Sequence, residues 1–228
     1  MNDAPIQLPL DLPHRAAYEH EDFLVAPSNW QAVSWIDQWP DWPCHCVIIY
    51  GAAGCGKTHL SHVWEKAAEA SRLTLQDINL ADFPEQATAV IVENVEDLMG
   101  EAGFQEKLFH LYNWQKEKGG FLLLSAKRPP KLWGMTLPDL SSRMLASTAI
   151  EIGVPDDALL SAIMVKQFSD RQINISKDVI AFLLPRMERS FAAVRAMVRA
   201  IDSLALSEKR KITVPLVRQL LEKTVKNL

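Results

Sequence analysis

Gly51-Ala52-Ala53-Gly54-Cys55-Gly56-Lys57-Thr58 decides the fold of this 228-residue chain. The stretch fits the pattern G-x-x-x-x-G-K-[ST], in which glycines shape a tight loop whose inward backbone N–H groups bind phosphate. An apolar run precedes it and a helical pattern follows it, and a helix N-terminus adds partial positive charge for an anion. Three of the chain's nine glycines lie within six positions here, a concentration that packing alone does not explain. The stretch therefore predicts a nucleotide site in which Lys57 contacts the β- and γ-phosphates and Thr58 binds Mg²⁺.

Outward from this loop, short apolar runs alternate with helical patterns. The runs predict five strands, at 46–50, 73–77, 88–93, 120–125 and 147–151. Helices are predicted around and between them, at 28–39, 57–71 and 104–118. This alternation is typical of βαβ units and predicts an α/β fold class, with a five-stranded, mostly parallel sheet flanked by helices.

The pattern changes after Val154, where every remaining periodic segment is helical. Helices are predicted at 156–169, 176–186, 190–207 and 213–226, with Asp156, Ser176, Ser190 and Thr213 as N-cap residues. We therefore expect a flexible tail at 1–20, an α/β nucleotide-binding domain at 21–153 and a small all-helical lid domain at 154–228.

Composition and charge exclude several classes of protein. Hydrophobic residues make up 48% of the chain and charged residues 23%, as in ordinary globular proteins. No window approaches the roughly 20 apolar residues of a membrane span, and three cysteines favour a reducing compartment, so we expect a cytoplasmic protein without membrane contact. Residues 151–228 hold 13 Lys and Arg against 9 Asp and Glu, whereas residues 1–150 hold 11 against 19. The acidic larger part argues against a DNA-binding surface over the whole molecule.

The run Ala89-Val90-Ile91-Val92-Glu93-Asn94 is the candidate for the acidic strand of the nucleotide site. Most phosphate-loop ATPases have Asp at the Glu93 position, where the carboxylate holds the Mg²⁺ shell. Those that hydrolyse ATP often have a second carboxylate next, and this chain has Asn94. An amide cannot accept a proton from water, so nucleotide binding is better supported than hydrolysis.

These motifs resemble the AAA+ family, and within it the bacterial replication initiators of the DnaA type, over roughly residues 21–226. Residues 22–29 are similar to the segment that lines the adenine pocket in that family, and 122–126 to the sensor I strand, with Ser125 or Lys127 at the polar position. Residues 137–144 are similar to the segment with the arginine finger, which puts that role on Arg143 although no helix or strand is predicted there. Residues 193–197 resemble the sensor II helix. The resemblance implies an AAA+ module with these nucleotide-binding residues: Leu24, Val25, Gly51, Ala52, Gly54, Cys55, Gly56, Lys57, Thr58, His59, Glu93, Asn94, Ser125 and Arg195.

The first residues add a second motif. Gln7-Leu8-Pro9-Leu10-Asp11-Leu12 resembles the peptides by which bacterial proteins bind the DNA polymerase III sliding clamp (its β subunit). The resemblance implies that Gln7, Leu8, Leu10 and Leu12 bind the clamp, with Gln7 in a polar subsite and Leu10 and Leu12 in an apolar pocket. DnaA-type initiators continue into a helix-turn-helix domain after the lid, and this chain stops there. The resemblance thus implies a regulator that reaches DNA through the clamp, binds ADP or ATP with Mg²⁺, and stimulates the ATP hydrolysis of DnaA. A homodimer fits the same architecture.

Two alternatives stay open from the sequence. An ATPase motor or helicase loader of the DnaC type shares the AAA+ module, but it needs turnover at its own site and a helicase-binding N-terminal domain. A DNA-binding initiator variant would use Lys209-Arg210-Lys211, whose more ordinary role is to end a helix.

Overall fold

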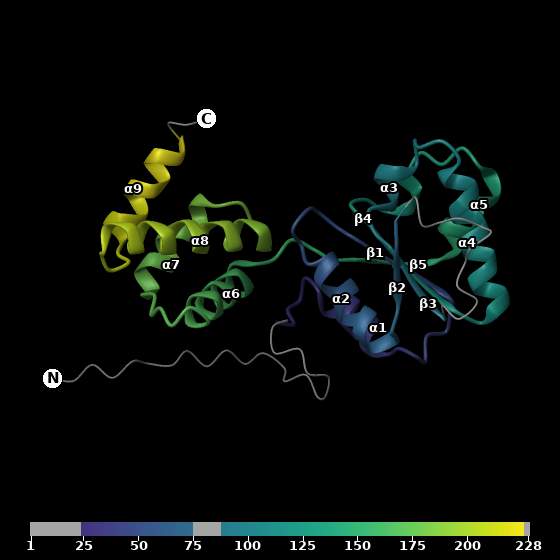
Figure 1. Cartoon of the computed structure of the whole chain (residues 1–228), viewed down its shortest axis with the longest axis horizontal. Helices are drawn as coiled ribbons and strands as arrows, with labels where there is room; N and C mark the ends of the chain where they lie inside the picture. Colours follow the sequence, from purple (N-terminus) through teal and green to yellow (C-terminus); the bar gives the residue numbers. More distant parts are fainter. Residues whose placement is uncertain (1–23, 75–87, 226–228) are drawn as a thin grey trace.

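The computed structural model describes residues 24–74 and 88–225 (Figure 1). The predicted clamp-binding residues Gln7, Leu8, Leu10 and Leu12 lie outside this range. Five strands form one sheet in the order β2-β3-β4-β1-β5, and every pair is parallel. Their bounds are β1 (Cys46–Tyr50), β2 (Ser71–Leu73), β3 (Ala89–Val92), β4 (Phe121–Ala126) and β5 (Thr148–Glu151). The predicted five-stranded α/β fold is confirmed.

Alternate residues of the central strands face opposite sides of the sheet, and both sides are buried. In β1, Cys46 and Ile48 pack with α3, α4 and α5, whereas Val47 and Ile49 pack with α1 and α2. Strands covered on both faces are apolar throughout, which explains the continuous apolar runs in the sequence. The helices are α1 (Trp30–Asp37), α2 (Lys57–Ala68), α3 (Val95–Leu98), α4 (Phe104–Lys118) and α5 (Pro138–Ala146), with a 3₁₀ turn η1 at Pro130–Leu132.

Three details of the sequence prediction were wrong in this part. Strand β2 begins at Ser71, so the predicted strand at 73–77 is misplaced, and its residues 75–77 lie outside the described range. Helix α5 was missed, since no element was predicted between the strands at 120–125 and 147–151; it begins at Pro138, and proline is well tolerated in a helix's first turn. Arg143 therefore lies on a helix and not on a connecting segment.

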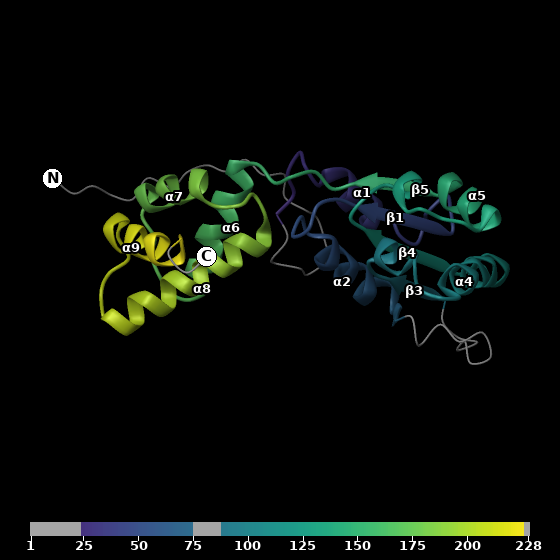
Figure 2. The ribbon, with the colours of Figure 1, turned by 90° about the horizontal axis from the view of Figure 1, so that it is seen from above.

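The lid is a second, all-helical lobe beside the sheet, reached by the segment after β5 (Figures 1 and 2). It consists of α6 (Asp157–Ser169), α7 (Lys177–Leu183), the 3₁₀ turn η2 (Leu184–Arg186), α8 (Phe191–Glu208) and α9 (Val214–Val225). Leu24 and Ala26 pack against its core, so the first described residues join the two lobes. No helix within the described ranges is long and apolar enough to cross a membrane.

Two of the predicted lid caps are confirmed. Asp156 Oδ1 accepts from the backbone N–H of Leu159 at 2.8 Å, and Ser190 Oγ accepts from that of Ala193 at 3.1 Å. Ser176 occupies the predicted N-cap position of α7, but its side chain makes no cap hydrogen bond within the described part of the chain.

Candidate nucleotide-binding site

The phosphate loop connects the end of β1 to the start of α2. Gly54 and Gly56 have φ angles of 74° and 110°, in the left-handed region that favours glycine, and Gly56 is the N-cap of α2. A Cβ atom at Gly54 would lie 2.9 Å from the Cβ of Ser190 in the lid. Backbone conformation therefore favours glycine at both positions, and at Gly54 the close approach of the lid requires it as well.

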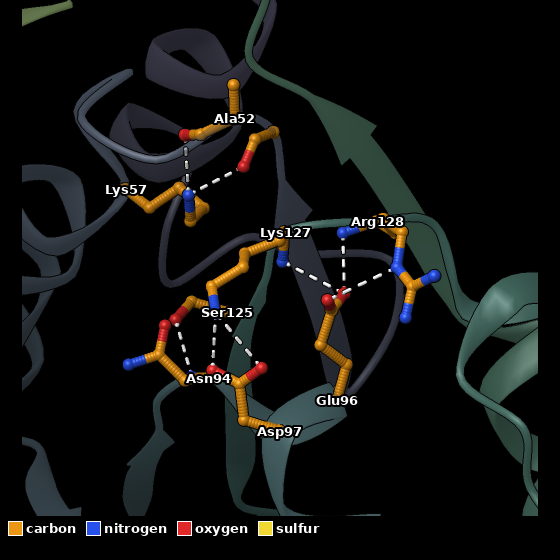
Figure 3. A network of polar contacts seen from close by, with 9 residues as sticks. Ala52, Lys57, Asn94, Glu96, Asp97, Ser125, Lys127 and Arg128 are labelled. Atoms are coloured by element: carbon orange, nitrogen blue, oxygen red, sulfur yellow. Dashed lines mark hydrogen bonds and ion pairs between the residues drawn. The ribbon is translucent and has the colours of Figure 1, made fainter.

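Lys57, the first residue of α2, is held inside the loop. Its side-chain Nζ donates to the carbonyl oxygens of Gly51 at 2.6 Å and Ala52 at 2.9 Å (Figure 3). A buried ammonium group needs such acceptors, and a phosphate oxygen would be a stronger one because it carries charge. Lys57 thus lies where the motif requires it.

The Cys55 thiol lies beside this ammonium group, and it is almost fully buried. Burial raises the pKa of Cys55, and the nearby Lys57 lowers it by a smaller amount. The thiol therefore stays protonated at neutral pH and acts as a small apolar side chain under the loop.

A cavity of about 510 Å³ lies between the phosphate loop and the lid. Eight of the predicted nucleotide-binding residues line it: Leu24, Gly54, Gly56, Lys57, Thr58, His59, Asn94 and Arg195. The other six are not part of its described lining: Val25, Gly51, Ala52, Cys55, Glu93 and Ser125.

The lid adds lining residues that sequence motifs missed. Helix α6 contributes Ile163, Lys166 and Gln167, and its C-cap residue Asp170 lines the cavity on the same face, because the spacing of these residues is three or four positions. Helix α8 contributes Phe191 and Ala192 besides Arg195. The helical spacing on α6 was visible in the sequence, but nothing there indicated which face meets the loop.

The cavity's charge suits a nucleoside phosphate. Lys57, Lys127 and the N-terminus of α2 bring positive charge to the loop side, and Arg195 brings it from the lid. Arg195 is exposed, and its guanidinium makes no ion pair or hydrogen bond with the residues described. The residues present therefore fit a di- or triphosphate between loop and lid.

The acidic residue at the end of the predicted strand forms an ion pair with the neighbouring strand. Glu93 directly follows β3, and its Oε2 pairs with Nη1 of Arg72 at 2.9 Å. Its Oε1 is buried and has no hydrogen-bond partner within residues 24–74 and 88–225. Thr58, which lines the cavity, fits a Mg²⁺ ligand, whereas Glu93 in this arrangement does not, because Arg72 engages its carboxylate outside the cavity lining.

The sensor I segment lies at the end of β4, next to this strand. Ser125 Oγ accepts from the backbone N–H of Asn94 at 3.1 Å (Figure 3). Lys127 lines the cavity, and its Nζ donates to both carboxylate oxygens of Asp97, at 2.7 and 3.0 Å. These bonds raise the pKa of Lys127, so its ammonium charge is secure at neutral pH. Ser125 thus supports the strand end, and of the two residues expected at the polar sensor position Lys127 is the one that lines the cavity.

Arg143 does not contribute to the described lining of its own chain's cavity. It lies on α5, and its guanidinium carbon is 5.6 Å from the centre of the Tyr112 ring and 5.8 Å from that of Phe109. The side chain is partly exposed. Its place on the surface of α5 allows contact with another molecule.

Comparison with known proteins shows what this architecture is similar to. Residues 157–221 match the family described as "Hda, lid domain". The chain is 25% identical over 227 residues to the chromosomal replication initiator protein DnaA of Thermomicrobium roseum, covering 87% of this chain and 48% of that protein. The chain thus spans about half the length of this curated relative.

Solved structures show the same fold. Domain III of DnaA from Thermotoga maritima matches with a TM-score of 0.77 at 19% identity, covering 89% of this chain and 95% of that one. AMPPCP-bound DnaA from Aquifex aeolicus matches with a TM-score of 0.69 at 19% identity, covering 79% and 63%.

The parallel sheet, the phosphate loop and the helical lid define an AAA+ module. More particularly, the chain is an AAA+ protein related to DnaA and Hda.

Proposed function

We propose that this protein is an Hda-like negative regulator of chromosomal replication initiation. It binds a nucleotide, docks on the DNA polymerase III sliding clamp, and stimulates hydrolysis of the ATP carried by DnaA. The match of residues 157–221 to the Hda lid domain, on a DnaA-like AAA+ fold, carries this proposal.

Arg143 is the residue we assign to the stimulated reaction. Arginine keeps its charge at every physiological pH and offers a planar fork, which suits the phosphate charge that develops during hydrolysis. Its position on α5 and its absence from the described lining of its own cavity support a role in trans. In this proposal Arg143 completes the nucleotide site of a DnaA molecule, which is left with ADP.

The chain's own site would hold ADP or ATP between loop and lid. In this proposal Lys57 and Arg195 bind the phosphates, and Leu24, which also lines the cavity, contacts the base. When bound, Mg²⁺ would offset phosphate charge beside Thr58. Asn94 cannot act as a general base, which supports slow turnover by this chain and an activating role toward DnaA.

Residues 7–12 would tether the protein to the clamp. Tethering raises the effective concentration of the AAA+ face near a DnaA molecule on the same DNA, so a weak direct contact suffices. Contact with DNA would be mainly indirect, and the protein would act in the cytoplasm, at the replisome. A homodimer is compatible with this arrangement.

The test follows hydrolysis of ATP prebound to the cognate DnaA, with clamp loaded on DNA, with and without this protein. We expect acceleration that Arg143→Ala and Gln7→Ala each abolish. Arg143→Lys is the matched control, since it keeps the charge but loses the fork, and we expect it to remain well below the wild type.

A different outcome would favour the helicase loader of the DnaC type. If DnaA-bound ATP is hydrolysed at an unchanged rate while this chain turns over ATP alone, the regulator proposal is wrong.

A further inference from the structure

Arg72 and Glu93 come from neighbouring strands and meet on one face of the sheet. Arg72 is aligned with Ile91 in the β2–β3 pair, and Glu93 follows two residues later, so it is expected on the same face as Ile91. Helix α2 covers that face and supplies Glu65. The Arg72 guanidinium pairs with Glu93 at 2.9 Å through Nη1 and with Glu65 at 2.8 Å through Nη2.

This bridge determines where the Glu93 carboxylate lies. One oxygen is bound to Arg72, and the other is buried without a hydrogen-bond partner among the described residues. A buried carboxylate oxygen without a donor is destabilising. The arrangement therefore holds an acidic group in a place where half of its hydrogen-bonding capacity is unused.

Stability alone does not explain the bridge. Both side chains are partly exposed, at 25% for Arg72 and 21% for Glu93, and partly exposed ion pairs contribute little to stability. The adjoining residue Asn94 lines the cavity, whereas Glu93 does not belong to its described lining. Glu93 is therefore paired with Arg72 outside the described lining, although the next residue along the chain belongs to that lining.

We propose that Arg72 is a positioning residue that holds Glu93 away from the phosphate loop. The bridge thereby weakens the dependence of nucleotide binding on Mg²⁺ and keeps the chain's own ATP turnover low. This inference rests on one part of the proposed function, namely that the chain binds a nucleotide.

The side-chain length of Glu93 matters for its contact with Arg72. Aspartate is one methylene shorter, so an aspartate at this position would draw its carboxylate back from Arg72. Two independent changes should therefore free the carboxylate at position 93 from its ion pair: removal of the Arg72 guanidinium, and shortening of the acidic side chain.

The experiment measures the affinity of the full chain for ADP and ATP with and without Mg²⁺, together with ATP turnover. The variants are Arg72→Gln and Glu93→Asp. We expect each to increase the Mg²⁺-dependent gain in affinity by about tenfold, the scale on which partners of metal-bound residues act, and to raise turnover. If Arg72→Gln fails to fold, Glu93→Asp tests the same release with Arg72 in place.

Two controls separate positioning from general disturbance of the strand. Glu65→Gln removes the other partner of Arg72 but leaves its bond to Glu93, so the Mg²⁺-dependent gain should stay at the wild-type value. The double variant Arg72→Gln with Glu93→Gln removes both members of the pair, and its gain should not rise.

The measurements distinguish failure of this inference from failure of the proposed function on which it rests. Folded Arg72→Gln and Glu93→Asp proteins that bind nucleotide with the wild-type Mg²⁺ dependence would overturn the inference alone. A wild-type chain that binds neither ADP nor ATP would overturn the nucleotide part of the proposed function as well. Stimulation of DnaA is measured separately, and its absence would leave the Mg²⁺ result standing.

Discussion

The carbonyl oxygen of Gly54 accepts a 2.9 Å hydrogen bond from the backbone N–H of Phe191, so the phosphate loop is joined directly to the first turn of α8. The first N–H groups of a helix have no partner within the helix. Here the loop satisfies one of them, and Ser190 satisfies that of Ala193. The conformation of the loop and the position of the lid are therefore linked.

Gly54→Ala tests this close approach. The added Cβ would meet Ser190 at 2.9 Å, and the φ of 74° is unfavourable for alanine. We expect the lid to move off the loop and the affinity for ADP to fall by roughly tenfold or more, as a lost charge-assisted contact would cause. Equilibrium binding of a fluorescent ADP analogue measures this loss of affinity.

Gly103→Ala is the matched control for that variant. Gly103 has a nearly identical φ of 73°, but an added Cβ would meet no described atom within 4 Å. Both alanines carry a backbone penalty of about 1–2 kcal/mol, so only Gly54→Ala should weaken nucleotide binding. Equal losses of affinity in both variants would contradict the role assigned to the lid contact.

Ser190→Ala removes the cap of α8. Loss of an N-cap side chain costs about 1 kcal/mol, and we expect that decrease in the free energy of unfolding from denaturant titration. Ser176→Ala makes the comparable change before α7, where no cap hydrogen bond is seen among the described residues, and it should change stability by less than about 0.5 kcal/mol. A similar decrease in the free energy of unfolding in both variants would mean that the Ser190 hydroxyl does not stabilise the protein through its cap hydrogen bond.

Arg195→Ala should weaken nucleotide binding, because this residue brings charge from the lid to the cavity. Hydrogen bonds to charged groups are worth about 1.5–3 kcal/mol, so a loss of at least tenfold in ADP affinity is expected. Arg199→Ala is the control, since Arg199 lies one turn further along α8 and outside the described lining. Isothermal titration calorimetry with ADP measures the affinity of both variants. An unchanged ADP affinity in Arg195→Ala would refute the assignment of Arg195 to the nucleotide site.

The strands of the sheet and the phosphate loop could be predicted from the sequence, whereas the contacts that support the site from other elements could not. Residues 46–50 and 51–58 could be predicted because both depend on local patterns, an apolar run and a spaced set of glycines. The bond between Gly54 and Phe191 and the pair of Arg72 with Glu93 could not, since each joins residues whose proximity depends on the folded arrangement. Ser176 illustrates a third limit: a residue type that suits a cap does not guarantee the side-chain rotamer that makes one.

Cys46 gives the protein a specific weakness at alkaline pH. Complete burial in β1 raises the pKa of its thiol from 9.0 to about 12, because the low-polarity core disfavours the thiolate. A raised pKa means that the folded state keeps its proton where the unfolded state loses it. The associated stability is therefore present below pH 9 and is lost progressively as the pH rises from 9 to about 12.

The expected size of this effect is about 1 kcal/mol between pH 9 and 10, since one pKa unit corresponds to about 1.4 kcal/mol. Cys46→Ala should lower stability at neutral pH through lost packing, and it should also remove this part of the alkaline decline, so its deficit relative to the wild type should shrink as the pH rises from 9 to 10. Guanidinium unfolding at pH 7.5, 9 and 10 compares the variant with the wild type, and parallel pH profiles for the two proteins would show that the thiol of Cys46 does not couple ionisation to folding.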